Sequence, residues 1–251
     1  MEIATLDEIL MMAGAAGIER LTLPELGSVC GLSEAVGDSE AAGKAAASDG
    51  ALKEAHKLLA GLMSRGWLVP QNGRAVLAGD MACFFHCIKN ASHMLCVLPR
   101  EQDYMPAWGW ISRDLTGIAR LEGVAAQPGA FRLQYTTPQD WCMAFCQWLS
   151  RDFFGISGKY REDSETETFH IETEPFDGYF IPGEMLMIQS KIKWLWDICP
   201  PGRPEDVNRR LMLAEEGAEH VLVYEEGTCR ERMPGNARLF QIYFKRLLGG
   251  G

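Results

Sequence analysis

The sequence predicts an α+β fold in which a winged-helix-like N-terminal segment precedes an antiparallel sheet flanked by helices. Three observations support this prediction. Helical patterns fill the first part of the chain and lead into a hairpin pattern, and four short β-rich segments then follow one another between residues 94 and 135. A loosely similar order of helix, strands and helix returns in the second half, which suggests a quasi-twofold duplication.

Composition and charge limit the possible classes of protein. The 251 residues are 47% hydrophobic and 23% charged, which is ordinary for a globular chain. The formal net charge of −10 argues against a nucleic-acid partner, since binding a phosphate backbone needs a basic patch. Eight cysteines are too few for a disulfide scaffold. The apolar run Ile9–Ile18 follows acidic residues and is about half the length that spans a bilayer, so we expect a cytoplasmic protein with no membrane partner.

The N-terminal segment, residues 1–78, is expected to hold helices and one hairpin. Helical patterns cover residues 3–13, begin again at residue 21, and cover residues 51–65. Asn72-Gly73 between two apolar triplets is a strong signal for a hairpin. Residues 33–50 are small and polar and predict a loop or a weak helix.

Residues 79–156 are expected to form a helix, an antiparallel meander and a second helix. The first helix covers residues 79–91, and β-rich segments lie at 94–98, 108–112, 117–122 and 131–135. The second helix has the clearest start in the chain, because Thr137 is suited to cap it and Pro138 fits its first position.

Residues 157–251 are expected to pack with residues 79–156 as one compact unit. An acidic connector with a strand at 168–173 leads into residues 183–198, which fit both a strand and a helix; their length favours a helix. A helix over 205–216, strands over 220–225 and 228–232, and a last helix capped by Asn236 complete the chain.

No pattern in the sequence indicates catalysis, a metal or a cofactor. Cys83, His86, Cys87 and His93 come nearest to a zinc set, but they do not share one face of a helix. Glycine loops that bind nucleotides are absent, and the acidic run near residue 165 is typical of a solvated surface. Three hypotheses remain: a non-enzymatic protein-binding module, a winged-helix transcription regulator with a ligand-sensing C-terminal domain, and an enzyme of unknown class. The first is favoured, because the candidate DNA-reading stretch, residues 33–40, carries acids.

One stretch resembles a known family. Residues 58–69 (LLAGLMSRGWLV), the following Asn72-Gly73, helix 79–91 and strand 94–98 are similar to the N-terminal half of EspG-type proteins, the chaperones of ESX (type VII) secretion. The resemblance implies a cytosolic chaperone that keeps a helical secretion substrate soluble. It also implies that loops at the sheet edge and a C-terminal helical bundle hold the substrate.

The residues expected to bind a partner lie in two loops. Turns and exposed aromatic side chains are where binding concentrates. On this basis we predict contacts from Glu122, Gln127 and Pro128 in the meander, and from Tyr179 and Phe180 after the acidic connector.

Overall fold

The computed structural model describes residues 2–18, 21, 49–100, 106–124, 126–127, 129–152, 170–189, 191–217 and 219–249. Its helices are α1 (Leu6–Ala15), α3 (Asp49–Ser64), α4 (Gly79–Lys89), α5 (Pro138–Asp152), α6 (Gly183–Gln189) and α7 (Ala237–Leu247). Its strands are β1 (Glu2–Thr5), β2 (Leu68–Gln71), β3 (Arg74–Leu77), β4 (Ala91–Pro99), β5 (Ala107–Ser112), β6 (Ile118–Gly123), β7 (Ala130–Thr136), β8 (Glu172–Pro175), β9 (Ile192–Cys199), β10 (Arg209–Glu216), β11 (Glu219–Glu226) and β12 (Cys229–Pro234). The helix expected from residue 21, the stretch 33–40 and most of the acidic connector lie outside the described residues.

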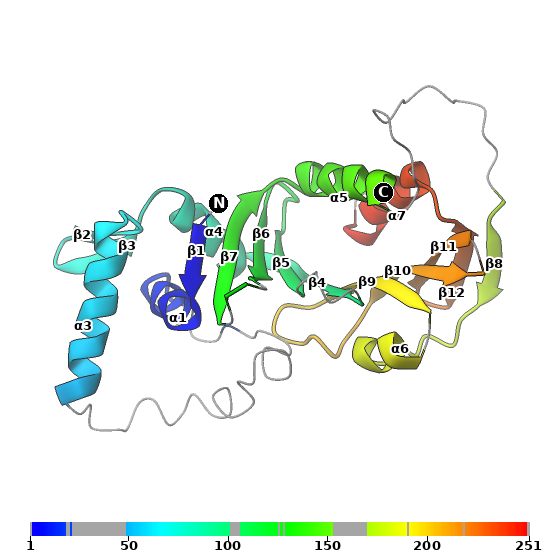
Figure 1. Ribbon diagram of the computed structural model, residues 1–251. Coiled ribbons are helices and arrows are strands. Elements are labelled where there is room, and N and C mark those ends of the chain that lie inside the picture. Colours follow the sequence, from blue (N-terminus) through cyan, green and yellow to red (C-terminus); the bar gives the residue numbers. More distant parts are fainter. Residues whose placement is uncertain are drawn as a thin grey trace.

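Ten strands form one antiparallel sheet in the order β1-β7-β6-β5-β4-β9-β10-β11-β12-β8 (Figure 1). At its centre β4 pairs with β9, and Val97 lies opposite Trp196. On one side of this pair the chain runs from α4 through β4–β7 to α5, and on the other from α6 through β9–β12 to α7. The predicted α+β class is therefore confirmed. The order of helix, four strands and helix occurs once in each half of the sheet, so the two halves form a quasi-twofold repeat.

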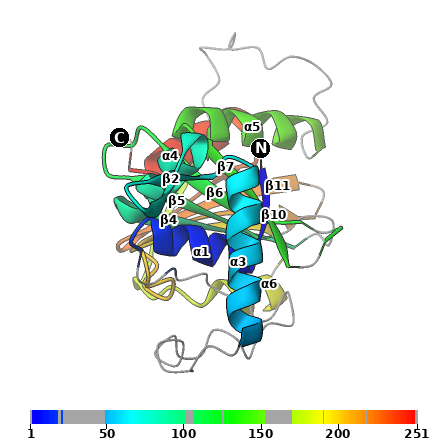
Figure 2. The same cartoon turned by 90° about the vertical axis from the view of Figure 1, so that its left-hand side faces the viewer.

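Helices cover both faces of the sheet. Over one face α5 and α7 lie together (Figure 1), and their Trp141 and Phe244 pack with Trp196 of β9 in one apolar core. In the first half α1 and α4 cover the opposite face, and the buried Phe84 belongs to a second core there. In the second half α6 packs over Leu195 on that same opposite face. Seen from the β1 edge, α3 stands across the end of the sheet (Figure 2).

The segment 183–198 is not one helix. It divides into α6 and β9, with the strand at the centre of the sheet. Trp194 and Trp196 face one core and Leu195 faces the other, so the strand is buried on both faces. A strand of this kind lacks the alternation of apolar and polar residues that marks a half-buried strand, which is why its pattern also fits a helix.

The helix predicted over 205–216 is wrong, because Arg209–Glu216 is strand β10. Its Leu, Met, Ala and Glu residues favour helices, but hydrogen-bonded neighbours on both sides override that preference. The second half of the duplication therefore begins at α6.

A further correction concerns the first predicted helix, over residues 3–13. Residues 2–5 form strand β1 instead, and helix α1 begins after them. Thr5 caps α1, because its hydroxyl accepts from the N–H of Glu8 and the Glu8 carboxylate accepts from the N–H of Thr5.

A row of charged residues crosses the second half of the sheet beside α6. Asp197, Arg210, Glu225 and Arg230 are register neighbours on β9, β10, β11 and β12. Nε and Nη2 of the fully buried Arg210 donate to the two carboxylate oxygens of Asp197, over 2.6 and 2.8 Å. Its Nη1 donates to the carbonyl of Ile181 over 2.8 Å. This last bond attaches the chain that leads into α6 to the sheet.

Candidate partner-binding surface

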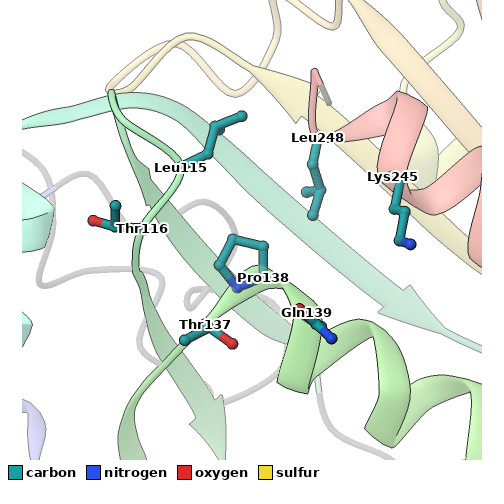
Figure 3. Close-up of a pocket in the computed structure, with 7 residues that line it drawn as sticks. All are labelled: Leu115, Thr116, Thr137, Pro138, Gln139, Lys245 and Leu248. Carbon is teal, nitrogen blue, oxygen red and sulfur yellow. The ribbon is translucent and has the colours of Figure 1, made fainter. Parts of the chain in front are cut away.

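A pocket of about 480 Å³ lies where the turn between β5 and β6 meets the start of α5 and the end of α7. Leu115, Pro138 and Leu248 supply apolar side chains from these three elements (Figure 3). Lys245 and Gln139 line one side of the pocket, and Thr116 and Thr137 complete the lining. The exposed ammonium of Lys245 forms no ion pair with any residue that the structure describes. An apolar pocket beside a free cation is suited to an aliphatic side chain next to an acidic one.

The turn that carries Leu115 is held by hydrogen bonds. Leu115 N donates to the carbonyl of Ser112 over 2.9 Å. The Asp114 carboxylate accepts from the N–H and hydroxyl of Thr116, over 3.2 and 2.8 Å. Within this frame Leu115 has φ of 57°, in the left-handed region that leucine rarely adopts. The turn therefore keeps an apolar side chain at the pocket at the expense of backbone strain.

The start of α5 is fixed as the sequence predicts. The hydroxyl of Thr137 accepts from the N–H of Asp140 over 3.1 Å and donates to its carboxylate over 2.7 Å. Pro138 occupies the first helical position. The cap thus orients Pro138 and Gln139 toward the pocket.

A second pocket, of about 680 Å³, lies on the other side of the same turn, against α4. Cys83, His86 and Tyr135 are among its lining residues. Burial raises the pKa of the neighbouring Cys87 thiol, which donates to the carbonyl of Trp110 over 3.1 Å. No three His, Cys, Asp or Glu side chains gather in a metal-binding arrangement within the described ranges.

Two of the residues predicted in the meander can be placed. Glu122 is partly buried on β6, where its carboxylate accepts from Arg120 over 2.7 Å and lies 3.7 Å from Nη1 of Arg132. Gln127 is exposed in the turn between β6 and β7, and Pro128 lies outside the described residues. Burial lowers the pKa of Arg120, and the charge of Glu122 opposes this shift.

The other two predicted residues lie elsewhere. Tyr179 is 68% exposed, whereas the ring of Phe180 lies 5.6 Å from the guanidinium of Arg210. Arg210 belongs to β10, and three strands separate β10 from β6 in the sheet. The structure therefore does not bring the two predicted loops together, and neither contributes to the pocket at Leu115.

Comparison with known proteins gives a likeness in structure only. No family model and no curated protein matches the chain. The chain is similar in fold to EspG5. That protein is a type VII secretion system chaperone of Mycobacterium tuberculosis, solved in complex with the PE25–PPE41 dimer. The likeness has a TM-score of 0.55 and covers 99% of this chain and 96% of EspG5.

Only 10% of the residues are identical, so the likeness to EspG5 shows the fold alone. The resemblance expected from residues 58–98 is confirmed at this level. Across the part of the chain that the structure describes, no helix is long and apolar enough to cross a membrane.

The sequence does not reveal Leu115 and Lys245 as residues of a binding surface. One signal was available, because Asp114 in a short polar run between two β-rich segments is typical of a turn. That signal does not reveal which way Leu115 points. Nothing in the sequence places Lys245 of α7 beside the start of α5.

Proposed function

We propose that this protein is a non-enzymatic, cytoplasmic chaperone-like adaptor that binds a helical substrate of type VII secretion. The observation that carries the proposal is the likeness to EspG5 over almost the full length of both chains, since EspG5 is a chaperone solved with a bound protein dimer. Fold alone does not establish function, so the proposal also needs a site on this chain. The pocket at Leu115 supplies one.

The partner's docking side chain is proposed to be aliphatic, with an acidic residue beside it. Leu115, Pro138 and Leu248 offer apolar surface from three elements whose positions the fold fixes. Lys245 adds a positive charge on a chain of net charge −10. Such an arrangement favours partners that carry both features and disfavours purely basic ones.

The test uses a purified PE–PPE heterodimer, titrated into the purified protein by calorimetry. Leu115→Asn removes the apolar wall while keeping a residue that tolerates the left-handed backbone. Losing a leucine contact is worth about 1.5–3 kcal/mol, so the dissociation constant should rise by roughly ten- to a hundredfold. Leu52→Asn is the matched control, because Leu52 is a leucine of α3 that is 49% exposed and does not line the pocket.

Two outcomes would contradict the proposal. Absence of binding to PE–PPE heterodimers would remove the type VII assignment. Equal loss of affinity in both variants would mean that the partner docks without using the pocket at Leu115.

A further inference from the structure

Two arginines share one carboxylate on the face of the sheet that carries α5. Arg120 and Glu122 lie on β6, and Arg132 lies on β7 directly opposite Glu122. Glu122 Oε2 is 2.7 Å from Nη2 of Arg120 and 3.7 Å from Nη1 of Arg132. The ring of Trp141 lies 5.4 Å from the Arg120 guanidinium.

Arg120 and Arg132 have more hydrogen-bond donors than the acceptors around them can pair. The Nε atoms of Arg120 and Arg132 are both buried, and neither has a hydrogen-bond acceptor among the described residues. A buried donor without an acceptor is unfavourable, and native proteins seldom leave one. Gln134, the register neighbour of Arg120, is uncharged, so the group carries a net charge of +1.

Other arginines of the sheet are paired differently. Arg210 has the carboxylate of Asp197, and Arg230 has that of Glu225. Neither of these arginines has an unpaired Nε. The excess of donors around Glu122 is therefore not a general feature of this sheet.

We infer that Arg120 and Arg132 bind carboxylates on an acidic segment of the protein partner. Charge complementarity supports this occupant, because an acidic segment is repelled by a chain of net charge −10 except where cations are left over. Because the Nε atoms are buried, a partner's carboxylate would be bound through the Nη atoms of the two guanidinium groups, whose side chains are 22% exposed at Arg120 and 37% exposed at Arg132. The inference rests on the proposed function only in taking the partner to be a protein.

The test measures fluorescence anisotropy of a short, labelled oligoglutamate peptide, with an oligolysine peptide as the negative control. We expect the oligoglutamate to bind and to weaken as salt rises. Arg132→Gln should weaken binding by about tenfold, and Glu122→Gln should strengthen it by about threefold because a competing carboxylate loses its charge. Arg203→Gln is the matched control, because it removes the same charge from an exposed residue whose only ion pair among the described residues is with Asp206. This substitution should change the affinity for the peptide by less than about twofold.

The comparison of Arg132→Gln with Arg203→Gln separates recognition from net charge, because both substitutions remove one positive charge. If Arg132→Gln and Arg203→Gln weaken binding equally, or if Glu122→Gln also weakens it, the inference is wrong. Thermal unfolding of each variant checks that the fold is retained, and light scattering checks that a second copy of the chain is not the occupant. A PE–PPE heterodimer that binds the wild type and Arg132→Gln equally would contradict this inference and leave the proposed function intact. If the peptide binds with the expected changes in the variants but no PE–PPE heterodimer binds, the proposed function is contradicted and this inference stands.

Discussion

Replacing Arg210 by methionine should destabilise the protein severely. The substitution keeps an apolar stem of similar length and removes three donated hydrogen bonds, two to Asp197 and one to Ile181. Asp197, which is only 5% exposed, then loses its cation. Breaking a buried ion pair by removing one partner costs about 3–5 kcal/mol, which is a large fraction of the stability of a typical domain.

The loss of stability in Arg210→Met should depend on pH. Burial raises the pKa of Asp197 from 3.8, and its hydrogen bond to Arg210 opposes this shift. Without Arg210 the folded-state pKa of Asp197 rises further above the unfolded-state value. An acid with a raised folded-state pKa stabilises the fold while it is protonated, so the deficit of Arg210→Met should be smallest below about pH 4 and should grow as pH rises toward the folded-state pKa.

Urea unfolding followed by circular dichroism, at about pH 5 and about pH 8, measures both effects. The double variant Asp197→Leu/Arg210→Met should regain most of the lost stability, because it removes both charges together. Arg203→Gln, in an exposed pair, should cost less than about 0.5 kcal/mol. A deficit of Arg210→Met that is below about 1 kcal/mol at pH 8, or that does not change with pH, would refute the reasoning.

Two further predictions concern packing and thiol reactivity. In Gly109→Ala the new Cβ would lie 2.5 Å from the buried ring of Trp141. We therefore expect the free energy of unfolding, measured by thermal denaturation, to fall by about 1–3 kcal/mol and the tryptophan fluorescence to shift. An unchanged melting curve would contradict this packing. Cys83 is exposed, whereas Cys87 is buried and burial raises its pKa. A thiol reagent should therefore label Cys83 in the native protein and Cys87 only after unfolding, as peptide mapping by mass spectrometry would show; native labelling of Cys87 would count against this.

The sequence predicts the first half of the sheet well, because local signals and tertiary structure agree there. Strands β4–β7 are short, β-rich and separated by turns, and all four contain the segments expected for them or overlap them closely. The cap of α5 at Thr137 is readable for the same reason, since capping depends on neighbouring residues alone.

Strands β9 and β10 could not be recognised from local patterns. They lie at the centre of the sheet and are buried on both faces, so the alternation that marks a strand is absent. Arg210 illustrates the difficulty. It lies within the helix predicted over 205–216, and only the pairing of β10 with β9 places it against Asp197.

The candidate surfaces could be predicted even less, because both depend on contacts between distant parts of the chain. The pocket needs Leu115 in a left-handed backbone and α7 beside the first turn of α5. The arginine group needs β6 and β7 in a register that sets Glu122 opposite Arg132. The sequence predicts Glu122 as a binding residue in a loop, whereas the structure places it within a strand, between two cations.

The first turn of α5 connects these two surfaces. Pro138 lines the pocket, and Trp141, on the next turn, packs against Arg120. A partner that used both surfaces would therefore place an aliphatic side chain in the pocket at Leu115 and a carboxylate on the arginine group, with the first turn of α5 between them. In that case the free-energy losses of Leu115→Asn and Arg132→Gln should add for the same partner, because neither residue contacts the other's surface. If instead each substitution weakens a different partner, the pocket and the arginine group serve separate functions.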